Sequence, residues 1–264
     1  MNTRIPLTIE QMRSTVPSIF ATAPISKVSG RYCFVPTIRV IEILEKAGWY
    51  PVSAQQTRAH DEEGMMYKKH LIQFGHADLP EINGCAPEIV LFNSHDTTCS
   101  FYLMAGLFRF ACLNSLLVYD AMFASFVIRH IGYQDQQILE AEYRIVNEFP
   151  RISQRISEFQ NIPLSWEEKI DFARASVRTR WHKEVSIINP ADLLVPRRTE
   201  DASETLWTVL NVIQENLFKG GISGFSRKGT QRKITTRAIK SVSEQVRINK
   251  SLWQIAEQIR ERKR

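Results

Sequence analysis

The sequence predicts an α+β protein, in which an antiparallel, strand-rich N-terminal half is followed by a helical C-terminal half with a basic loop and a terminal helix. Short apolar runs separated by Gly, Pro and Asn dominate the first half, and apolar residues at helical spacing dominate the second. Strands and helices do not alternate along the chain, which argues against an α/β fold. We expect an irregular lead-in over residues 1–30, a strand-rich region over 31–132, a helical region over 133–221, and a basic loop with the C-terminal helix over 222–264.

The strand-rich region opens with a short helix and a hairpin. Apolar residues at helical spacing predict a helix over Ile38–Lys46, which Gly48 ends as a C-terminal cap. Tyr50–Ala59 and Met66–Gly75 then flank the acidic segment Asp61–Gly64. A polar, glycine-containing segment between two strand-like runs predicts a β-hairpin.

Two apolar segments follow the hairpin. Glu88–Phe92 is expected to be a third strand. Phe101–Ala111 is apolar on every side apart from Arg109, and periodicity alone does not separate a buried strand from a buried helix. Gly106 is compatible with a packed strand or with a kinked helix, so both alternatives stay open.

The helical region carries three start or stop signals. A long amphipathic face begins at Gln134, and Pro150 within it predicts a kink or a break. Ser165–Glu168 has the sequence of a capping box, in which the serine accepts from the first turn and the glutamate reaches back. A further helix is expected over Ser203–Lys219, and Gly220-Gly221 ends it.

The end of the chain is strongly basic. Phe218–Arg264 holds 13 of the 34 Lys and Arg residues but only 3 of the 28 acids, so it carries +10, whereas the rest of the chain (21 cations against 25 acids) carries −4. Residues 222–235, rich in Gly, Lys and Arg, are expected to form a loop or to stay disordered until bound. A final helix is expected over Arg237–Arg260, because its apolar residues fall on one side.

This charge favours a polyanionic partner, and nucleic acid is the commonest one, since each neutralised phosphate releases counterions. The candidate contact residues lie in a 22-residue stretch without an acid: Lys219, Arg227, Lys228, Arg232, Lys233, Arg237 and Lys240. A merely solvated linker is the competing interpretation. Phe225 and Trp253 are candidates for stacking on unpaired bases, although the apolar spacing around Trp253 favours core packing.

Composition and apolar patterning favour a globular cytoplasmic protein over a secreted or membrane-spanning one. Apolar residues at 44% and charged residues at 23% are ordinary for a globular protein, and no secretory signal is recognised. The most apolar stretch, Phe101–Ile128, is interrupted by Arg109 and Asp120, which argues against a membrane span. The four cysteines show no C-x-x-C spacing, so we expect reduced thiols in the cytoplasm.

Several blocks together resemble the YfjQ/YafZ family, a prophage- and plasmid-borne group of phage/plasmid-like proteins of unknown function. The blocks are Glu88-Ile-Val-Leu-Phe-Asn-Ser-His-Asp96, Gly106-Leu-Phe-Arg-Phe-Ala-Cys-Leu-Asn114, Leu206-Trp207 with Asn211, Gln214-Glu-Asn-Leu-Phe-Lys-Gly-Gly221, Arg247-Ile-Asn249 and Leu252-Trp253. The resemblance extends from about Tyr32 to Glu257. It implies a mobile-element context but no activity and no catalytic residues. The chain departs from the family at Ser115, where the family tends to have glycine.

The block Asn93–Asp96 is the best candidate for chemistry. A metal site needs about three or four ligands. The residues available are His70, His76, His95, Asp96, Cys99 and His130. They show no recognisable metal-binding spacing, so we expect no metal and no cofactor, and a polar turn in which Asn93, Ser94 and Asp96 bond their own backbone. A Ser-His-Asp relay among neighbours is excluded, because adjacent strand residues point to opposite faces.

We therefore expect a nucleic-acid-binding accessory protein of a mobile element rather than an enzyme, with single-stranded DNA as one candidate ligand. The order of expected elements in the front half is similar to that of phage single-strand annealing proteins, which is an analogy at fold level. A second hypothesis is an anti-defence protein that binds a host protein. The third is a metal-dependent nuclease built around His95 and Asp96.

Overall fold

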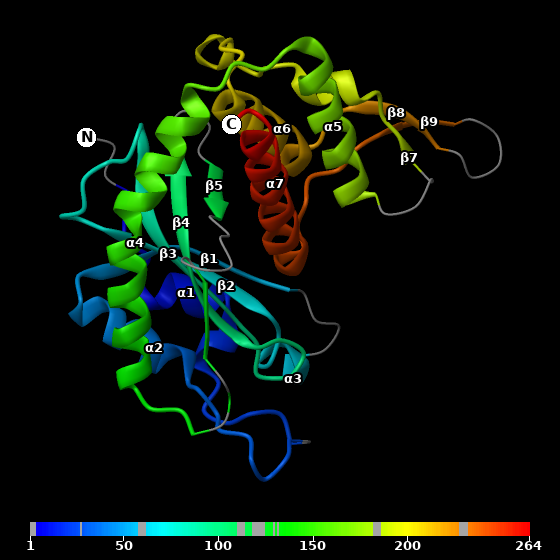
Figure 1. The fold of residues 1–264 in the computed structure, drawn as a ribbon. Coiled ribbons are helices and arrows are strands. Elements are labelled where there is room, and N and C mark those ends of the chain that lie inside the picture. Colours follow the sequence, from blue (N-terminus) through cyan, green and yellow to red (C-terminus); the bar gives the residue numbers. More distant parts are fainter. Residues whose placement is uncertain are drawn as a thin grey trace. The chain divides into compact units, whose positions relative to one another are not determined.

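The computed structural model describes residues 4–26, 28–57, 62–109, 114–117, 125–128, 130, 132–181, 186–226 and 232–264. The chain divides into two compact units, Met1–Pro150 and Arg151–Arg264, and the boundary lies inside a long helix. Strands dominate the first unit and helices the second (Figure 1). This arrangement confirms the predicted α+β class.

The first unit is built on one antiparallel sheet. Its elements are α1 (Ile9–Thr15), the 3-10 helix η1 (Pro17–Phe20), α2 (Thr37–Lys46), β1 (Trp49–Gln56), α3 (Glu62–Met65), β2 (His70–His76), β3 (Cys85–Asn93), β4 (Phe101–Arg109), β5 (Asn114–Leu117), β6 (Ser125–Ile128) and the start of α4 (Gln136–Gln160). Strands β1 to β4 pair antiparallel in chain order, and β5 and β6 both pair with β4, β6 near its start and β5 near its end.

The expected helix, hairpin and third strand of this unit are confirmed as α2, β1–β2 and β3. The connection between β1 and β2 contains the short helix α3 rather than a simple turn. The apolar segment that periodicity left ambiguous is the strand β4. It pairs with β3 from Tyr102 to Arg109, a tertiary interaction that no local pattern encodes.

Gly106 allows β3 and β4 to approach closely. It pairs with Glu88, and a Cβ at this position would lie 2.8 Å from Val90 Cγ2 and 3.2 Å from Glu88 Cβ. The side chain of Glu88 is fully buried and forms an ion pair with Arg4. A larger residue at position 106 would therefore push against a buried, charged contact.

The lead-in is more ordered than expected. Thr8 and Gln11 form a capping box that starts α1, since Thr8 Oγ1 accepts from the Gln11 backbone and the Gln11 side chain accepts from the Thr8 backbone. Met12 on α1 and Ile19 on η1 are 1% and 0% exposed. The expectation of an irregular segment over residues 1–30 overlooked both the cap and these buried anchors.

The second unit is mainly helical. It contains the end of α4, α5 (Trp166–Arg180), β7 (Ser186–Ile187), the 3-10 helices η2 (Pro190–Leu194) and η3 (Thr199–Asp201), α6 (Leu206–Lys219), β8 (Ser223–Ser226), β9 (Arg232–Thr235) and α7 (Val242–Arg262). Helices α5, α6 and α7 pack against one another, and α7 is red in Figure 1. Strands β7, β8 and β9 form a small antiparallel sheet.

Most of the helix signals in the sequence are confirmed. Pro150 lies inside α4, which continues through it, so the helix does not break there. The capping box at Ser165 is confirmed. Trp207 and Leu210 of α6 are 4% and 0% exposed, and α6 ends at Gly220, whose φ of +66° suits glycine. No helix in the described part of the chain is long and apolar enough to span a membrane.

The segment 222–235 is the main correction in this unit. A loop or a disordered segment is expected there, but its described ends form the two strands of the β8–β9 hairpin. Hydrogen bonds at the base of the hairpin explain why: Gly221 N donates to Thr236 O (2.9 Å), and Thr236 N donates to Ile222 O (2.8 Å). The terminal helix begins at Val242, later than expected, because Ser241 caps it.

Candidate nucleic-acid interface

The β8–β9 hairpin presents one aromatic and two basic side chains to solvent. Phe225 on β8 pairs with Lys233 on β9, and Ser226 pairs with Arg232. Directly paired residues share a face of the sheet and neighbours in sequence alternate. Phe225 and Lys233 therefore lie side by side on one face, with Arg232 on the other. Phe225 is 52% exposed, which is unusual for a phenylalanine.

The basic residues of this region differ in how far their charge is compensated. Arg232, Lys233, Arg237 and Lys240 are exposed, and none of the four forms an ion pair with an acid in the described part of the chain. Lys219 differs, because its ammonium group donates to Glu215 Oε1 at 2.7 Å. The predicted contact residues Arg227 and Lys228 lie outside the described residues.

Two arginines outside the predicted set of contact residues fix the base of the hairpin. Arg180 donates to the carbonyl oxygens of Leu217 and Arg237, so it ties the end of α6 to the segment after β9. Arg197 donates to Asn216 Oδ1 (2.7 Å) and to the carbonyl oxygen of Gly220. Such donors satisfy the carbonyl groups that a helix leaves unpaired at its end. Arg180 and Arg197 therefore fix the end of α6 and the segments that lead into and out of the hairpin.

The distinctive Gln-Glu-Asn block is buried and has a structural role. Gln214 Nε2 donates to Asn249 Oδ1 at 2.7 Å, which links two of the family-like blocks across α6 and α7. Asn216 Nδ2 donates to the carbonyl oxygens of Leu193 (3.0 Å) and Val195 (2.9 Å). Gln214 and Asn216 are 1% and 3% exposed, so they are unavailable to a ligand.

Two further side chains of this unit are occupied within the fold. Arg198 pairs with Asp201 (3.4 Å) and with Glu215. Trp253 is 1% exposed and its ring centroid lies 5.3 Å from that of Phe159, so it packs in the core. Of the two candidate stacking residues, Phe225 alone is exposed.

The Asn93–Asp96 block lies in the first unit, where a hydroxyl links two buried histidines. Thr37 Oγ1 lies 2.9 Å from His70 Nε2 and 3.2 Å from His95 Nε2, and it accepts from Asn93 Nδ2 at 3.3 Å. The hydroxyl of Ser18 lies 3.0 Å from His70 Nδ1. All five side chains are fully buried. We call them the Thr37 network.

Hydrogen bonding assigns the proton on each ring. His70 Nδ1 lies 3.0 Å from the carbonyl oxygen of Lys68, which can only accept, so Nδ1 carries the proton and Nε2 accepts. The single hydroxyl proton of Thr37 is then donated to His70. Thr37 Oγ1 has no second proton to donate, so it accepts from His95 Nε2.

Burial keeps both rings neutral. Desolvation lowers the pKa of His70 to about 4, although the Lys68 carbonyl acts in the opposite direction. Desolvation, with smaller contributions from His70 and His130, lowers the pKa of His95 to about 3. Neutral rings are required for the tautomers assigned above. The Thr37 network therefore joins the ends of η1, α2, β2 and β3 without charge.

Asp96 and Ser94 form the expected turn. Asp96 Oδ1 accepts from Thr98 N at 3.1 Å, and Ser94 Oγ accepts from Cys99 N at 3.2 Å. Asn93 departs from the expectation, because it bonds Thr37 rather than its own backbone. Within the described residues, no three His, Cys, Asp or Glu side chains are grouped so that they could hold a metal ion.

The comparisons with known proteins agree with the blocks noted above. Residues 24–253 match the family described as "Domain of unknown function (DUF932)". The chain is 34% identical over 253 residues to UPF0380 protein YfjQ and, separately, to UPF0380 protein YafZ, both of Escherichia coli strain K12. Each alignment covers 96% of this chain and 91% of the relative. No solved structure matches the chain. The chain belongs to the DUF932 family, together with the YfjQ and YafZ proteins.

Proposed function

We propose that this protein is a nucleic-acid-binding accessory protein of a mobile element and that the β8–β9 hairpin contacts the ligand. The observation that supports it most is Phe225, half exposed and paired across the hairpin with Lys233. A ring beside an uncompensated cation can stack on a base while the cation meets a phosphate. The resemblance to a prophage- and plasmid-borne family supports the mobile-element context.

The mode of binding follows from the residue types. Arg232, Lys233, Arg237 and Lys240 supply phosphate contacts, which position the chain on its ligand without reading sequence. Phe225 supplies a stacking surface, and every base has a face that can stack. A face is accessible only where the base is unpaired and not stacked on its neighbours. We therefore propose single-stranded nucleic acid as the preferred ligand.

The test compares single-stranded DNA, single-stranded RNA and duplex DNA of one length by fluorescence anisotropy at fixed salt. Phe225→Ala should weaken single-strand binding about tenfold, because a stacked base contributes about 1–3 kcal/mol. Phe225→Trp should retain the affinity, and duplex binding should change little in either variant. Equal losses on single strand and duplex, or no loss on either, would contradict a stacking contact.

A further inference from the structure

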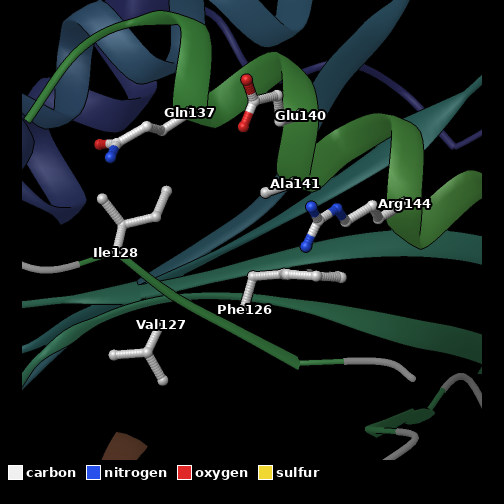
Figure 2. Close-up of a pocket in the computed structure, with 7 residues that line it drawn as sticks. All are labelled: Phe126, Val127, Ile128, Gln137, Glu140, Ala141 and Arg144. Atoms are coloured by element: carbon white, nitrogen blue, oxygen red, sulfur yellow. The ribbon is translucent and has the colours of Figure 1, made fainter. Parts of the chain in front are cut away.

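A pocket of about 280 Å³ lies between β6 and α4 in the first unit. Its lining residues are Phe126, Val127 and Ile128 of β6 and Gln137, Glu140, Ala141 and Arg144 of α4. Figure 2 shows Phe126 and Ile128 pointing toward the helix and Val127 pointing to the other side of the strand. Ile128 and Ala141 are 5% and 4% exposed, so the pocket has an apolar floor.

Two residues of opposite charge line the pocket and do not pair with each other. Glu140 and Arg144 are one helical turn apart, a spacing that usually favours an ion pair. Both side chains are exposed, yet neither takes part in an ion pair within the described part of the chain. Figure 2 shows the Arg144 guanidinium directed toward Phe126, and its central carbon lies 5.8 Å from the ring centroid.

A polar group completes the other end of the pocket. Gln137 Oε1 accepts from the Gln134 backbone at 3.3 Å, which leaves the Nε2 group of its amide as a donor. In Figure 2 the amide of Gln137 lies at the Ile128 side, away from Arg144. The lining therefore offers, in order along α4, a donor, a carboxylate acceptor and a cation above an apolar floor.

We propose that this pocket binds one unpaired nucleotide. The phosphate pairs with Arg144, the base lies against Phe126 and Ile128, and an amino group on the base edge donates to Glu140. A nucleotide carries its phosphate and its base edge at opposite ends, which suits a cation and a carboxylate that lie one helical turn apart and do not pair with each other.

The inference rests on the proposed function, because it supplies a second contact for a nucleic-acid strand. It also explains a preference for single strands, since a paired base has no free edge to offer Glu140. The volume is close to the lower end of about 300–1,000 Å³ for small-molecule pockets, which suits one nucleotide rather than a longer segment.

The test uses mononucleotides and the full chain, followed by NMR chemical shifts and calorimetry. AMP and CMP, which carry base amino groups, should bind more tightly than UMP. Arg144→Gln should raise the Kd for all three about tenfold, as expected for one lost charge-assisted hydrogen bond. Glu140→Gln should remove the preference for AMP and CMP over UMP. Arg178→Gln, at an exposed arginine of α5 that forms no ion pair among the described residues, is the matched control and should change neither the Kd values nor the preference.

The outcomes separate this site from the hairpin. Arg232→Gln with Lys233→Gln should weaken oligonucleotide binding but leave AMP binding unchanged. If the hairpin variant bound oligonucleotides as tightly as the wild type, the proposed function would be contradicted, whereas saturable AMP binding would still support the pocket. No saturable binding of any mononucleotide by the folded protein would overturn the pocket. Binding of inorganic phosphate as tight as that of AMP would also overturn it, because the base would then contribute nothing.

Discussion

The Thr37 network and the β8–β9 hairpin are both polar regions, but they use their polar groups in opposite ways. In the network, hydroxyl, amide and imidazole groups are fully buried and bond one another. On the hairpin, Arg232 and Lys233 are exposed and have no acidic partner in the described part of the chain. Asn93, Ser94 and His95 of the family-like block are buried and bonded within the fold, whereas the basic residues of the hairpin keep their charges exposed to solvent.

The largest expected effect is on the free energy of unfolding, and it should differ sharply between two aromatic residues of the second unit. Trp207→Ala should lower the free energy of unfolding by about 3–5 kcal/mol, because it empties a buried position on α6. Phe225→Ala should change it by less than about 0.5 kcal/mol, as an exposed substitution does. Urea unfolding followed by circular dichroism measures both. Similar losses in the two variants would mean that Phe225 has a structural role.

Acid should destabilise the Thr37 network. The folded-state pKa values of about 4 for His70 and about 3 for His95 lie below the ordinary value of 6.5. Below pH 6.5 the unfolded chain binds protons that the folded chain does not, so stability falls as pH falls from about 6.5 to about 4. The loss should reach a few kcal/mol, because a difference of one in pKa between the folded and unfolded states corresponds to about 1.4 kcal/mol.

The control for this pH dependence is His95→Gln, which removes one of the two buried imidazoles. Urea unfolding at pH values between about 7.5 and about 4.5, the range in which an ordinary histidine gains its proton, should show a shallower dependence on pH in that variant. A wild-type stability that stays constant across this range would show that the rings are not held neutral in the fold.

Thr37→Val should cost about 2 kcal/mol, because it keeps the shape but leaves buried imidazole and amide groups without their partner. Thr37→Ser retains the hydroxyl and should recover most of the loss. Neither variant should alter affinity for nucleic acid by more than about twofold, since the network lies inside the first unit. A large loss of nucleic-acid affinity in folded Thr37→Val would show that the Thr37 network influences the binding surface. It would contradict the separate roles given to the two regions.

The smallest expected effect concerns Lys219, the predicted contact residue that pairs with Glu215. Lys219→Gln should lower stability by less than about 1 kcal/mol, as loss of a partly exposed ion pair does. It should reduce affinity for single-stranded DNA less than Lys233→Gln, because its charge is already compensated. Anisotropy titrations of the two variants at one salt concentration decide the order.

Local signals predicted much of the fold. The capping box at Ser165, the buried face of α6 and the β1–β2 hairpin follow from spacing, and all are confirmed. The strand β4 does not follow, because its pairing with β3 decides between strand and helix. The capping box at Thr8 was present in the sequence and would have revealed α1.

The candidate sites were less predictable. Thr37 contacts His70, His95 and Asn93, which are 33, 58 and 56 residues away along the chain, so no spacing pattern marks it. The pairing of β8 with β9 was missed because its glycines and cations resemble those of a disordered segment. Charge alone marked Arg232 and Lys233 as candidate contact residues. Only the strand register places Phe225 beside Lys233.

The most direct test of the hairpin as the contact surface is the salt dependence of single-stranded DNA binding. Arg232→Gln with Lys233→Gln removes two exposed cations, and Arg178→Gln with Arg262→Gln removes two exposed cations of α5 and α7, which form no ion pair among the described residues, as a charge-matched control. Each phosphate contact contributes about 0.7 to the slope of log K against log salt for a single strand, so the hairpin variant should lose about 1.4. The control should keep the wild-type slope. Equal slopes in the hairpin variant and the wild type, with both proteins folded, would contradict the assignment.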